Sequence, residues 1–188
     1  MKKIAIFASG SGSNAEAIIN WAQTKRLVEV VCVFSDRRES YVLERASIKG
    51  VPAFFLKKKK LETAQSFDQR ILKNLSLYNP DWIILAGYMK LLTPHFLEHF
   101  KNRVVNIHPS LLPLFPGKDG YGDAYKARVS ESGCTVHYVD EGIDTGEVIE
   151  QKKIELIPGE SFEAFKQRGQ KVENEFYPQV LERLFENI

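Results

Sequence analysis

The chain has 188 residues, of which 44% are hydrophobic, 27% charged and 11% aromatic. This length suits one domain with a sizeable core, expected over residues 1–188, and the composition excludes general disorder. The 26 basic and 24 acidic side chains give a formal net charge of only +2, which does not indicate a nucleic acid as the main partner, although it leaves room for a local basic patch.

The first predicted element is a buried strand. Ile4 to Ala8 is an unbroken apolar run that stops at a glycine–serine turn, as is typical of a strand covered on both faces of a parallel sheet. A helix is expected from Ala15 to about Lys25, and Ser13 and Glu16 before and within it have the spacing of a capping box.

Strands and helices then alternate along the chain. We expect strands at 28–34, 51–56, 82–86 and 103–107, and helices at 41–49, 61–78 and 94–100. After Pro109 we expect a long ordered loop to Tyr121, strands at 135–139 and 148–157, and a helix from about Phe162 in which Pro178 is a candidate kink. The alternation predicts an α/β fold, a single domain with a mostly parallel twisted sheet and helices on both faces.

The cysteines and the first residues bear on the compartment. Cys32 and Cys134 lie in apolar runs, where buried free thiols are expected, and two cysteines are too few for a disulfide framework. The apolar run after Met1 is too short for a signal peptide or a membrane span. We therefore expect a cytoplasmic protein with no membrane partner.

A glycine loop joins the first strand to the first helix. The segment Ser9-Gly10-Ser11-Gly12-Ser13-Asn14 gathers backbone N–H groups at the positive end of the helix dipole. Glycines let the backbone approach a phosphate closely, and the hydroxyls and the amide add hydrogen-bond donors. The loop therefore predicts a phosphate site.

The same loop leaves two alternatives open. Gly10, Gly12 and Ala15 match the G-x-G-x-x-A dinucleotide fingerprint, and Asp36 at the end of the second strand is placed to bind a ribose hydroxyl. A nicotinamide-dinucleotide-binding protein is thus the alternative from another class. The structural alternative is a glycine turn needed only for tight packing of strand against helix.

Two polar residues end the strand at 103–107. Because side chains alternate along a strand, Asn106 and His108 point to the same side, at the carboxyl end of the sheet where α/β proteins bind ligands. The pair suits acyl transfer without a covalent enzyme intermediate: Asn106 donates to an oxygen that becomes negative, and His108 donates or carries a proton.

A third polar group comes from the segment Gly142-Ile143-Asp144-Thr145-Gly146, which predicts a carboxylate on a tight turn at a cleft. Asp144 beside His108 would favour the charged imidazolium, which is the better acid near neutral pH. A turn aspartate that bonds only its own backbone is the alternative.

Several of these segments together resemble one family. They are the glycine loop, Leu85-Ala86-Gly87-Tyr88-Met89, Asn106-Ile107-His108-Pro109-Ser110-Leu111-Leu112-Pro113, Gly133-Cys134-Thr135-Val136-His137-Tyr138-Val139 and the turn at 142–146. In this order, from about residue 3 to residue 183, they resemble the phosphoribosylglycinamide formyltransferase family, folate-dependent enzymes of purine synthesis.

The resemblance implies a reaction. The amine of glycinamide ribonucleotide attacks the formyl carbon of the co-substrate 10-formyltetrahydrofolate, with no metal. Asn106, His108 and Asp144 match the family's catalytic residues. The first two would stabilise the tetrahedral oxyanion, each donor by about 3 kcal/mol. His108 would also help to protonate the leaving folate nitrogen, and Asp144 would keep the histidine charged and order a water that relays a proton.

The resemblance also implies binding residues. The ribonucleotide phosphate would lie on the segment Gly12, Ser13 and Asn14, and Gln170 and Glu173 would contact the ribonucleotide, Glu173 at the ribose hydroxyls. The pterin would lie against the segment Met89, Lys90, Leu91 and Leu92.

The chain departs from the family pattern in two places. Where the family often has a folate-binding arginine, it has Glu62-Thr63-Ala64-Gln65, and Lys57 to Lys60 could attract the folate's glutamate tail instead or be a solvated charge run. Where relatives often have histidines after Pro116-Gly117, it has Lys118 to Asp123. We therefore expect substrate contacts to differ there, whereas the three catalytic positions match the family.

Other interpretations are weaker. His95 to His99 spells the zinc motif H-x-x-E-H, but its predicted helix is short and no third ligand is evident, and His137 is expected to be structural. A methionyl-tRNA formyltransferase or a formyltetrahydrofolate hydrolase would normally carry an additional domain. We expect small-molecule substrates, no nucleic acid, and a monomer or homodimer.

Overall fold

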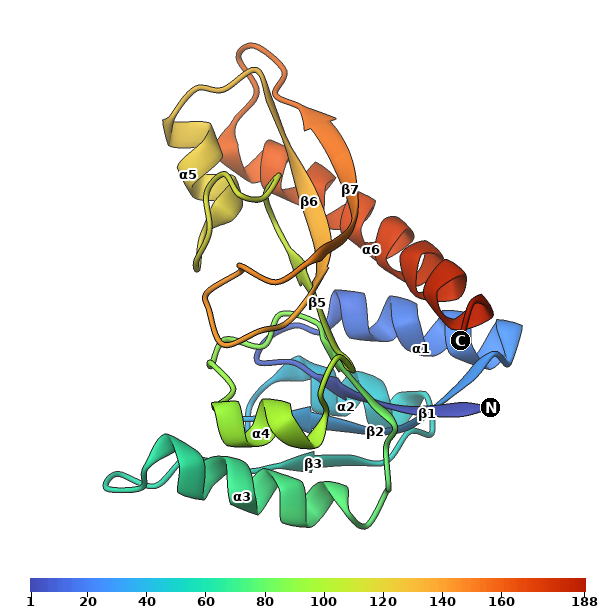
Figure 1. Ribbon diagram of the computed structural model, residues 1–188. Helices are drawn as coiled ribbons and strands as arrows, with labels where there is room; N and C mark the ends of the chain where they lie inside the picture. Colours follow the sequence, from blue (N-terminus) through green and yellow to red (C-terminus); the bar gives the residue numbers. More distant parts are fainter.

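The protein is built on one seven-stranded sheet, which the computed structural model describes over all 188 residues (Figure 1). The strands lie in the order β3-β2-β1-β4-β5-β6-β7, with β1 to β5 parallel and β6 and β7 antiparallel to their neighbours. Their bounds are β1 Lys2–Phe7, β2 Val28–Ser35, β3 Ala53–Phe55, β4 Trp82–Leu85, β5 Val104–His108, β6 Glu131–Tyr138 and β7 Val148–Glu155. The predicted α/β fold with a mostly parallel sheet is confirmed.

Helices cover both faces of this sheet. They are α1 Ser13–Lys25, α2 Tyr41–Ile48, α3 Ala64–Leu75, α4 Pro94–His99, α5 Gly120–Lys126 and α6 Phe162–Glu186. Helices α1, α2 and α6 pack on one face, and α3 and α4 on the other (Figure 1). The parallel strands are therefore buried on both sides.

Strand β1 illustrates why these residues form a central strand. Ile4 and Ile6 enter the core under α1 and α6, whereas Ala5 and Phe7 enter the core under α3 and α4. All four are fully buried, and burying a large apolar side chain contributes about 1.5–3 kcal/mol. An apolar residue at every position is what a strand with two covered faces requires.

The start of α1 differs from the prediction. Gly12 is the N-cap residue in a left-handed conformation (φ 76°), and no side chain caps this helix end. The predicted capping box of Ser13 and Glu16 is therefore wrong, because α1 already begins at Ser13. The first-turn N–H groups of α1 are left without a side-chain cap.

The region after Pro109 is more ordered than predicted. Helix α5 begins at Gly120, inside the expected loop, where the side chain of Asp119 caps it by accepting from the N–H of Gly122 at 3.1 Å. Strand β6 begins at Glu131, four positions before the predicted start. Helix α6 continues through Pro178, which is buried in the core, so that tertiary packing offsets the hydrogen bond that proline cannot donate.

One tyrosine of α6 reaches into the sheet. The hydroxyl of Tyr177, fully buried, lies 3.1 Å from the carbonyl oxygens of both Leu85, the last residue of β4, and Val105, the second residue of the neighbouring strand β5. Helix α6 is thereby hydrogen-bonded directly to β4 and to β5, the strand that carries Asn106 and His108. None of the helices combines the length and the apolar character needed to cross a membrane.

Candidate active site

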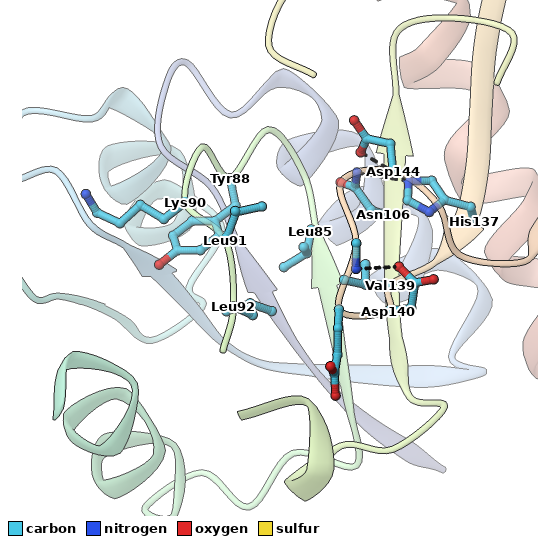
Figure 2. A pocket seen from close by; sticks show the side chains of 12 residues that line it. Leu85, Tyr88, Lys90, Leu91, Leu92, Asn106, His137, Val139, Asp140 and Asp144 are labelled. Atoms are coloured by element: carbon cyan, nitrogen blue, oxygen red, sulfur yellow. Dashed lines mark hydrogen bonds and ion pairs between the residues drawn. The ribbon is translucent and has the colours of Figure 1, made fainter. Parts of the chain in front are cut away.

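Two cavities lie at the carboxyl ends of the parallel strands, near the point where the strand order reverses between β1 and β4. Open α/β sheets bind ligands at this position. The Leu92 cavity, of about 80 Å³, is lined by Leu85, Tyr88, Lys90, Leu91, Leu92, Asn106, His137, Val139, Asp140, Glu141, Gly142 and Asp144 (Figure 2). The Gln170 cavity, of about 240 Å³, is lined by Asn14, Gly87, Tyr88, Met89, Asn106, Ile107, His108, Pro109, Gly117, Lys118, Asp119, Tyr121, Asp144, Lys166, Gln170 and Glu173.

The two cavities share three residues. Tyr88, Asn106 and Asp144 line both of them, so these side chains stand at the boundary between two binding spaces. Polar groups at such a boundary can act on atoms that pass from one ligand to another.

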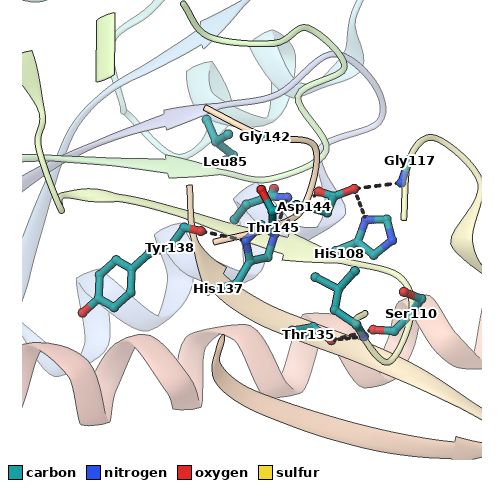
Figure 3. Close-up of polar contacts among 12 residues, drawn as sticks. Leu85, His108, Ser110, Gly117, Thr135, His137, Tyr138, Gly142, Asp144 and Thr145 are labelled. Atoms are coloured by element: carbon teal, nitrogen blue, oxygen red, sulfur yellow. Dashed lines mark hydrogen bonds and ion pairs between the residues drawn. The ribbon is translucent and has the colours of Figure 1, made fainter. Parts of the chain in front are cut away.

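His108 and Asp144 form a buried pair. Nδ1 of His108 lies 3.2 Å from Oδ2 of Asp144, and the same oxygen accepts a hydrogen bond from the backbone N–H of Gly117 at 2.8 Å (Figure 3). Nε2 of His108 lies 2.8 Å from the carbonyl oxygen of Phe115. Both ring nitrogens thus face acceptors, and only a doubly protonated ring donates to both.

The turn that carries Asp144 is tightly built. Asp144 has a left-handed backbone (φ 54°), which is uncommon for a residue other than glycine. The carboxylate of Asp140 accepts from the N–H of Gly142 at 3.0 Å and from the hydroxyl of Thr145 at 2.7 Å. A side chain at Gly146 would collide with the carbonyl of Tyr138. These contacts explain the flanking glycines.

His137 lies beside Asn106. Its Nδ1 is 2.8 Å from the carbonyl oxygen of Tyr138, so Nδ1 carries the hydrogen, and the unprotonated Nε2 accepts from the amide of Asn106 at 3.2 Å. Burial lowers the pKa of His137 below its ordinary value of 6.5, although the Tyr138 carbonyl and Asp144 oppose this shift. The neutral ring therefore fixes the amide of Asn106.

The contact between His137 and Asn106 was not predicted from the sequence. The expected structural role agrees with its burial, but the ring also lines the Leu92 cavity and lies 3.6 Å from Oδ1 of Asp144. The available signal was strand pairing: Asn106 and His137 are directly opposite in the antiparallel β5–β6 pair.

The glycine loop rests on α2. The N–H of Val42 donates to the carbonyl of Gly10 at 3.3 Å, and Nε of Arg45 donates to the carbonyl of Ser11 at 2.9 Å. Gly12 and Ser13 are not among the residues that line the two cavities, whereas Asn14 lines the Gln170 cavity.

Glu173 is the most buried acid of the site. Its carboxylate accepts from the side-chain amide of Asn14 at 2.7 Å, across the contact between α6 and α1. Burial raises the pKa of Glu173, and the hydrogen bond from Asn14 opposes the shift. The predicted ribonucleotide residues Asn14, Gln170 and Glu173 are thus brought together.

Two lysine side chains for which no role was predicted also line the Gln170 cavity. Lys118 and Lys166 line it, from the loop before α5 and from α6. Lys118 belongs to the segment that departs from the family pattern, whereas Lys166 carried no signal because it is one of many charged residues on a helix.

The predicted pterin segment follows β4 and is divided between the cavities. Lys90, Leu91 and Leu92 line the Leu92 cavity, and Met89 lines the Gln170 cavity. Nearby, Glu62, in the place of the family's arginine segment, is ion-paired with Arg70 at 2.9 Å, and the side chains of Lys57 to Lys60 are exposed.

The structure does not support the dinucleotide fingerprint or the H-x-x-E-H motif as binding sites. Asp36 is bonded to protein groups through both carboxylate oxygens, to the hydroxyl of Ser9 at 2.6 Å and to Nζ of Lys90 at 3.1 Å, so it does not stand ready for a ribose. His99 bonds the carbonyl of His95 through Nδ1 at 2.8 Å, and no group of three or more His, Cys, Asp or Glu side chains is arranged to hold a metal ion.

Comparison with known proteins gives a consistent picture. The family model described as formyl transferase matches residues 2–181. The phosphoribosylglycinamide formyltransferase of Bacillus subtilis (strain 168) is 44% identical over 190 residues, which cover 98% of this chain and 95% of that protein. The trifunctional purine biosynthetic protein adenosine-3 of Drosophila melanogaster is 37% identical over 97% of this chain, which spans only 14% of that protein.

Solved structures agree with these sequence matches. Glycinamide ribonucleotide transformylase 1 from Geobacillus kaustophilus superposes with a TM-score of 0.94 at 49% identity, covering 98% of this chain and 99% of that one. The transformylase 1 from Symbiobacterium toebii superposes with a TM-score of 0.95 at 37% identity, covering 100% and 89%. The nicotinamide alternative has no support from these matches. This chain belongs to the formyl transferase family, among the phosphoribosylglycinamide formyltransferases.

Proposed function

We propose that this protein transfers the formyl group of 10-formyltetrahydrofolate to the amine of glycinamide ribonucleotide. The observation that carries the proposal is that Asn106 and Asp144 line both cavities. A transferase of two large substrates needs two binding spaces that meet at the reacting atoms, and the polar groups at that meeting point must suit the transferred group. Membership of the family supports the choice of substrates.

The acceptor side is assigned to the Gln170 cavity. Lys118 and Lys166 supply positive charge there, and Asn14, Gln170 and Glu173 supply hydrogen-bonding groups for a sugar phosphate. In this proposal the phosphate lies near the first turn of α1, at Gly12, Ser13 and Asn14, where free backbone N–H groups favour an anion.

The donor side is assigned to the Leu92 cavity. Leu85, Leu91 and Leu92 provide apolar walls for a planar ring, and the segment Met89 to Leu92 offers main-chain groups to its edge. The formyl carbon would then lie toward Asn106 and Asp144, which Figure 2 places across the cavity from Lys90.

The chemistry begins with attack of the ribonucleotide amine on the formyl carbon. A C–N bond forms, and the formyl oxygen becomes negative in a tetrahedral intermediate. The amide of Asn106, held by His137, donates to this oxygen, and each such donor contributes about 3 kcal/mol to the stability of the transition state. His108 is the second donor in the proposal.

His108 needs a change of partner to act. Its Nε2 lies 2.8 Å from the carbonyl of Phe115, so the formyl oxygen would replace this carbonyl as the acceptor. The segment that carries Phe115 would then move away from the ring. The Nδ1 side stays on Asp144, which keeps the ring oriented.

The intermediate collapses when the bond from carbon to folate nitrogen N10 breaks. N10 leaves as a neutral amine only if it gains a proton, and the attacking amine must lose one. In the proposal His108 supplies the proton to N10, and a water ordered by Asp144 returns the amine's proton. The products are formylated ribonucleotide and tetrahydrofolate, with no net change in protons on the enzyme.

The proposal also covers the domain organisation, the partners and the cellular location of the protein. We infer one formyltransferase domain over residues 1–188, small-molecule partners, a cytoplasmic location, and no requirement for a metal or nicotinamide. The oligomeric state is expected to be monomer or homodimer.

The test is transfer by purified protein from 10-formyltetrahydrofolate to glycinamide ribonucleotide, followed by absorbance of the folate product, with and without a chelator. We expect turnover in both conditions and none with Asn106→Ala at matched enzyme concentration. Inactivity on this pair together with activity on charged initiator tRNA would assign the chain to the methionyl-tRNA enzymes instead. Slow release of formate without ribonucleotide dependence would favour a hydrolase.

A further inference from the structure

Asp36 is a buried acid for which the proposed reaction has no use. It follows β2, is only 6% exposed, and has both carboxylate oxygens bonded. Oδ1 accepts from the hydroxyl of Ser9, and Oδ2 is ion-paired with Nζ of Lys90. Burying a carboxylate costs free energy unless such partners satisfy it, so the pairing is a specific feature of this site.

Ser9 connects Asp36 to the loop after β4. Its hydroxyl donates to Asp36 at 2.6 Å and accepts from the backbone N–H of Met89 at 3.0 Å, while its own N–H donates to the carbonyl of Gly87 at 3.1 Å. Ser9 is only 2% exposed. Residues 87 and 89 of the loop are therefore both hydrogen-bonded to one buried serine.

Lys90 adds a charged tie to the same loop. Its side chain extends away from Asn106 and Asp144 (Figure 2), and its ammonium group lies 3.1 Å from Asp36. The Asp36 carboxylate thus holds the next residue of the loop as well. Tyr88 and Leu92 of the same loop are buried in the core, whereas Met89 and Leu91 are 44% and 67% exposed, so the exposed middle of the loop depends on Ser9 and Asp36.

We propose that Asp36, acting through Ser9 and Lys90, is a positioning residue that holds the loop from Gly87 to Leu92 in the shape that receives the formyl donor. The inference rests on the proposed function, because that function assigns the loop to the folate. This role differs from the one in the dinucleotide fingerprint, where the carboxylate would bind a ribose hydroxyl. Here the carboxylate binds other protein groups and so fixes the shape of the loop.

The energetics follow from charge and burial. Hydrogen bonds to a charged group are stronger than hydrogen bonds between neutral groups. Loss of such a bond from a binding loop should lower the affinity for the ligand by about tenfold. Since Asp36 does not touch the reacting atoms, its loss should act on donor binding and leave the chemical step almost unchanged. The acceptor side should change little, because Lys118, Lys166 and Gln170 come from other elements.

The experiment compares three variants with the wild type. Asp36→Asn removes the charge with little change of shape, and Ser9→Ala removes only the bridging hydroxyl. Asp81→Asn is the matched control, since Asp81 is likewise a carboxylate that accepts a hydrogen bond from a distant part of the chain, the backbone N–H of Lys3 at 2.7 Å, but it lies at the opposite end of the strands. Titration calorimetry with 5-formyltetrahydrofolate, an unreactive folate, measures donor-side binding without turnover.

We expect Asp36→Asn and Ser9→Ala to weaken binding of this folate about tenfold and to raise KM for the formyl donor by the same factor. The kcat of both variants and the KM of Asp36→Asn for ribonucleotide should stay within about twofold of the wild type, as should all constants of Asp81→Asn. Unchanged folate affinity in both site variants would overturn the inference, as would a fall in kcat at unchanged folate affinity.

Hydrogen exchange provides a readout that needs no ligand. Amides of residues 87–92 should exchange faster in Asp36→Asn and Ser9→Ala than in Asp81→Asn and the wild type. If Asp36→Asn does not fold, Ser9→Ala decides the question. If the wild type does not bind the folate probe, the proposed function is wrong, but the positioning role is still tested by hydrogen exchange. If the loop exchanges at the same rate in the variants and in the wild type, the positioning role is wrong.

Discussion

Nδ1 of His108 lies 3.2 Å from Oδ2 of Asp144, and both side chains are largely buried. The pair places a carboxylate directly behind the ring that is proposed to donate to the substrate. Two hydrogen-bonded groups in a site with little water interact more strongly than they would on the surface.

The first prediction concerns this carboxylate. Asp144→Asn keeps the shape but removes the charge, so it should lower kcat by about 10²-fold or more while leaving the dissociation constant of the ribonucleotide nearly unchanged. Steady-state kinetics with both substrates varied would measure this, with calorimetry for binding. A pure rise in KM at constant kcat would contradict an electrostatic role.

The second prediction uses two neighbouring glycines. At Gly12 (φ +76°) an added Cβ would lie 2.4 Å from Cγ2 of Val42, so Gly12→Ala should destabilise the fold and weaken ribonucleotide binding. Gly10→Ala is the control, because nothing lies within 4 Å of its Cβ position. Thermal unfolding should separate the two by several degrees, and equal melting temperatures would show that the α2 contact does not constrain the loop.

The third prediction concerns Glu173. Because burial raises its pKa above 4.5, the folded state holds this proton more tightly than the unfolded chain does. The stability it contributes is complete below pH 4.5 and is lost as the pH rises through the folded-state pKa. Glu173→Gln should therefore melt at a higher temperature near pH 7, by about 2–4 °C for each kcal/mol regained.

The same variant should bind the ribonucleotide about tenfold more weakly, since a neutral amide is a poorer acceptor for ribose hydroxyls. Melting curves at pH 4 and pH 8 test the stability part, and the gain should shrink at pH 4. A gain that is equal at both pH values would mean that the charge of Glu173 is not the cause.

The fourth prediction follows from His137. Since its pKa is lowered from 6.5, the unfolded chain takes up a proton before the folded state does, so stability is lost as the pH falls below about 6.5. His137→Gln should lose less stability than the wild type between pH 7 and pH 5.5. Parallel denaturant titrations at these pH values measure the difference, and identical losses would count against a neutral buried ring.

The sequence predicted the sheet well because its strands are locally distinct. Ile4 to Ala8 and Trp82 to Ala86 are apolar at every position, which is the pattern that a strand with two covered faces must have. Asn106 and His108 could be paired from strand alternation alone, and both indeed line the Gln170 cavity.

The missed features depend on contacts far apart in the chain. Helix α5 begins in a segment rich in glycine, Gly120-Tyr121-Gly122, where local propensity opposes a helix and packing of Tyr121 and Phe165 favours it. The partners of Asp36 could not be predicted for a similar reason. Its partners Ser9 and Lys90 follow different strands, and only the fold brings the three together.

The edges of the sheet have a consequence for solubility. Outer strand β7 leaves one row of backbone groups unpaired, but Lys152, Lys153 and Glu155 are exposed along it, and the opposite edge β3 is only three residues long. Charges and short length both discourage addition of a foreign strand. Aggregation by edge-to-edge pairing is therefore disfavoured at both ends, and replacing the two lysines with valines should make the protein precipitate at lower concentration.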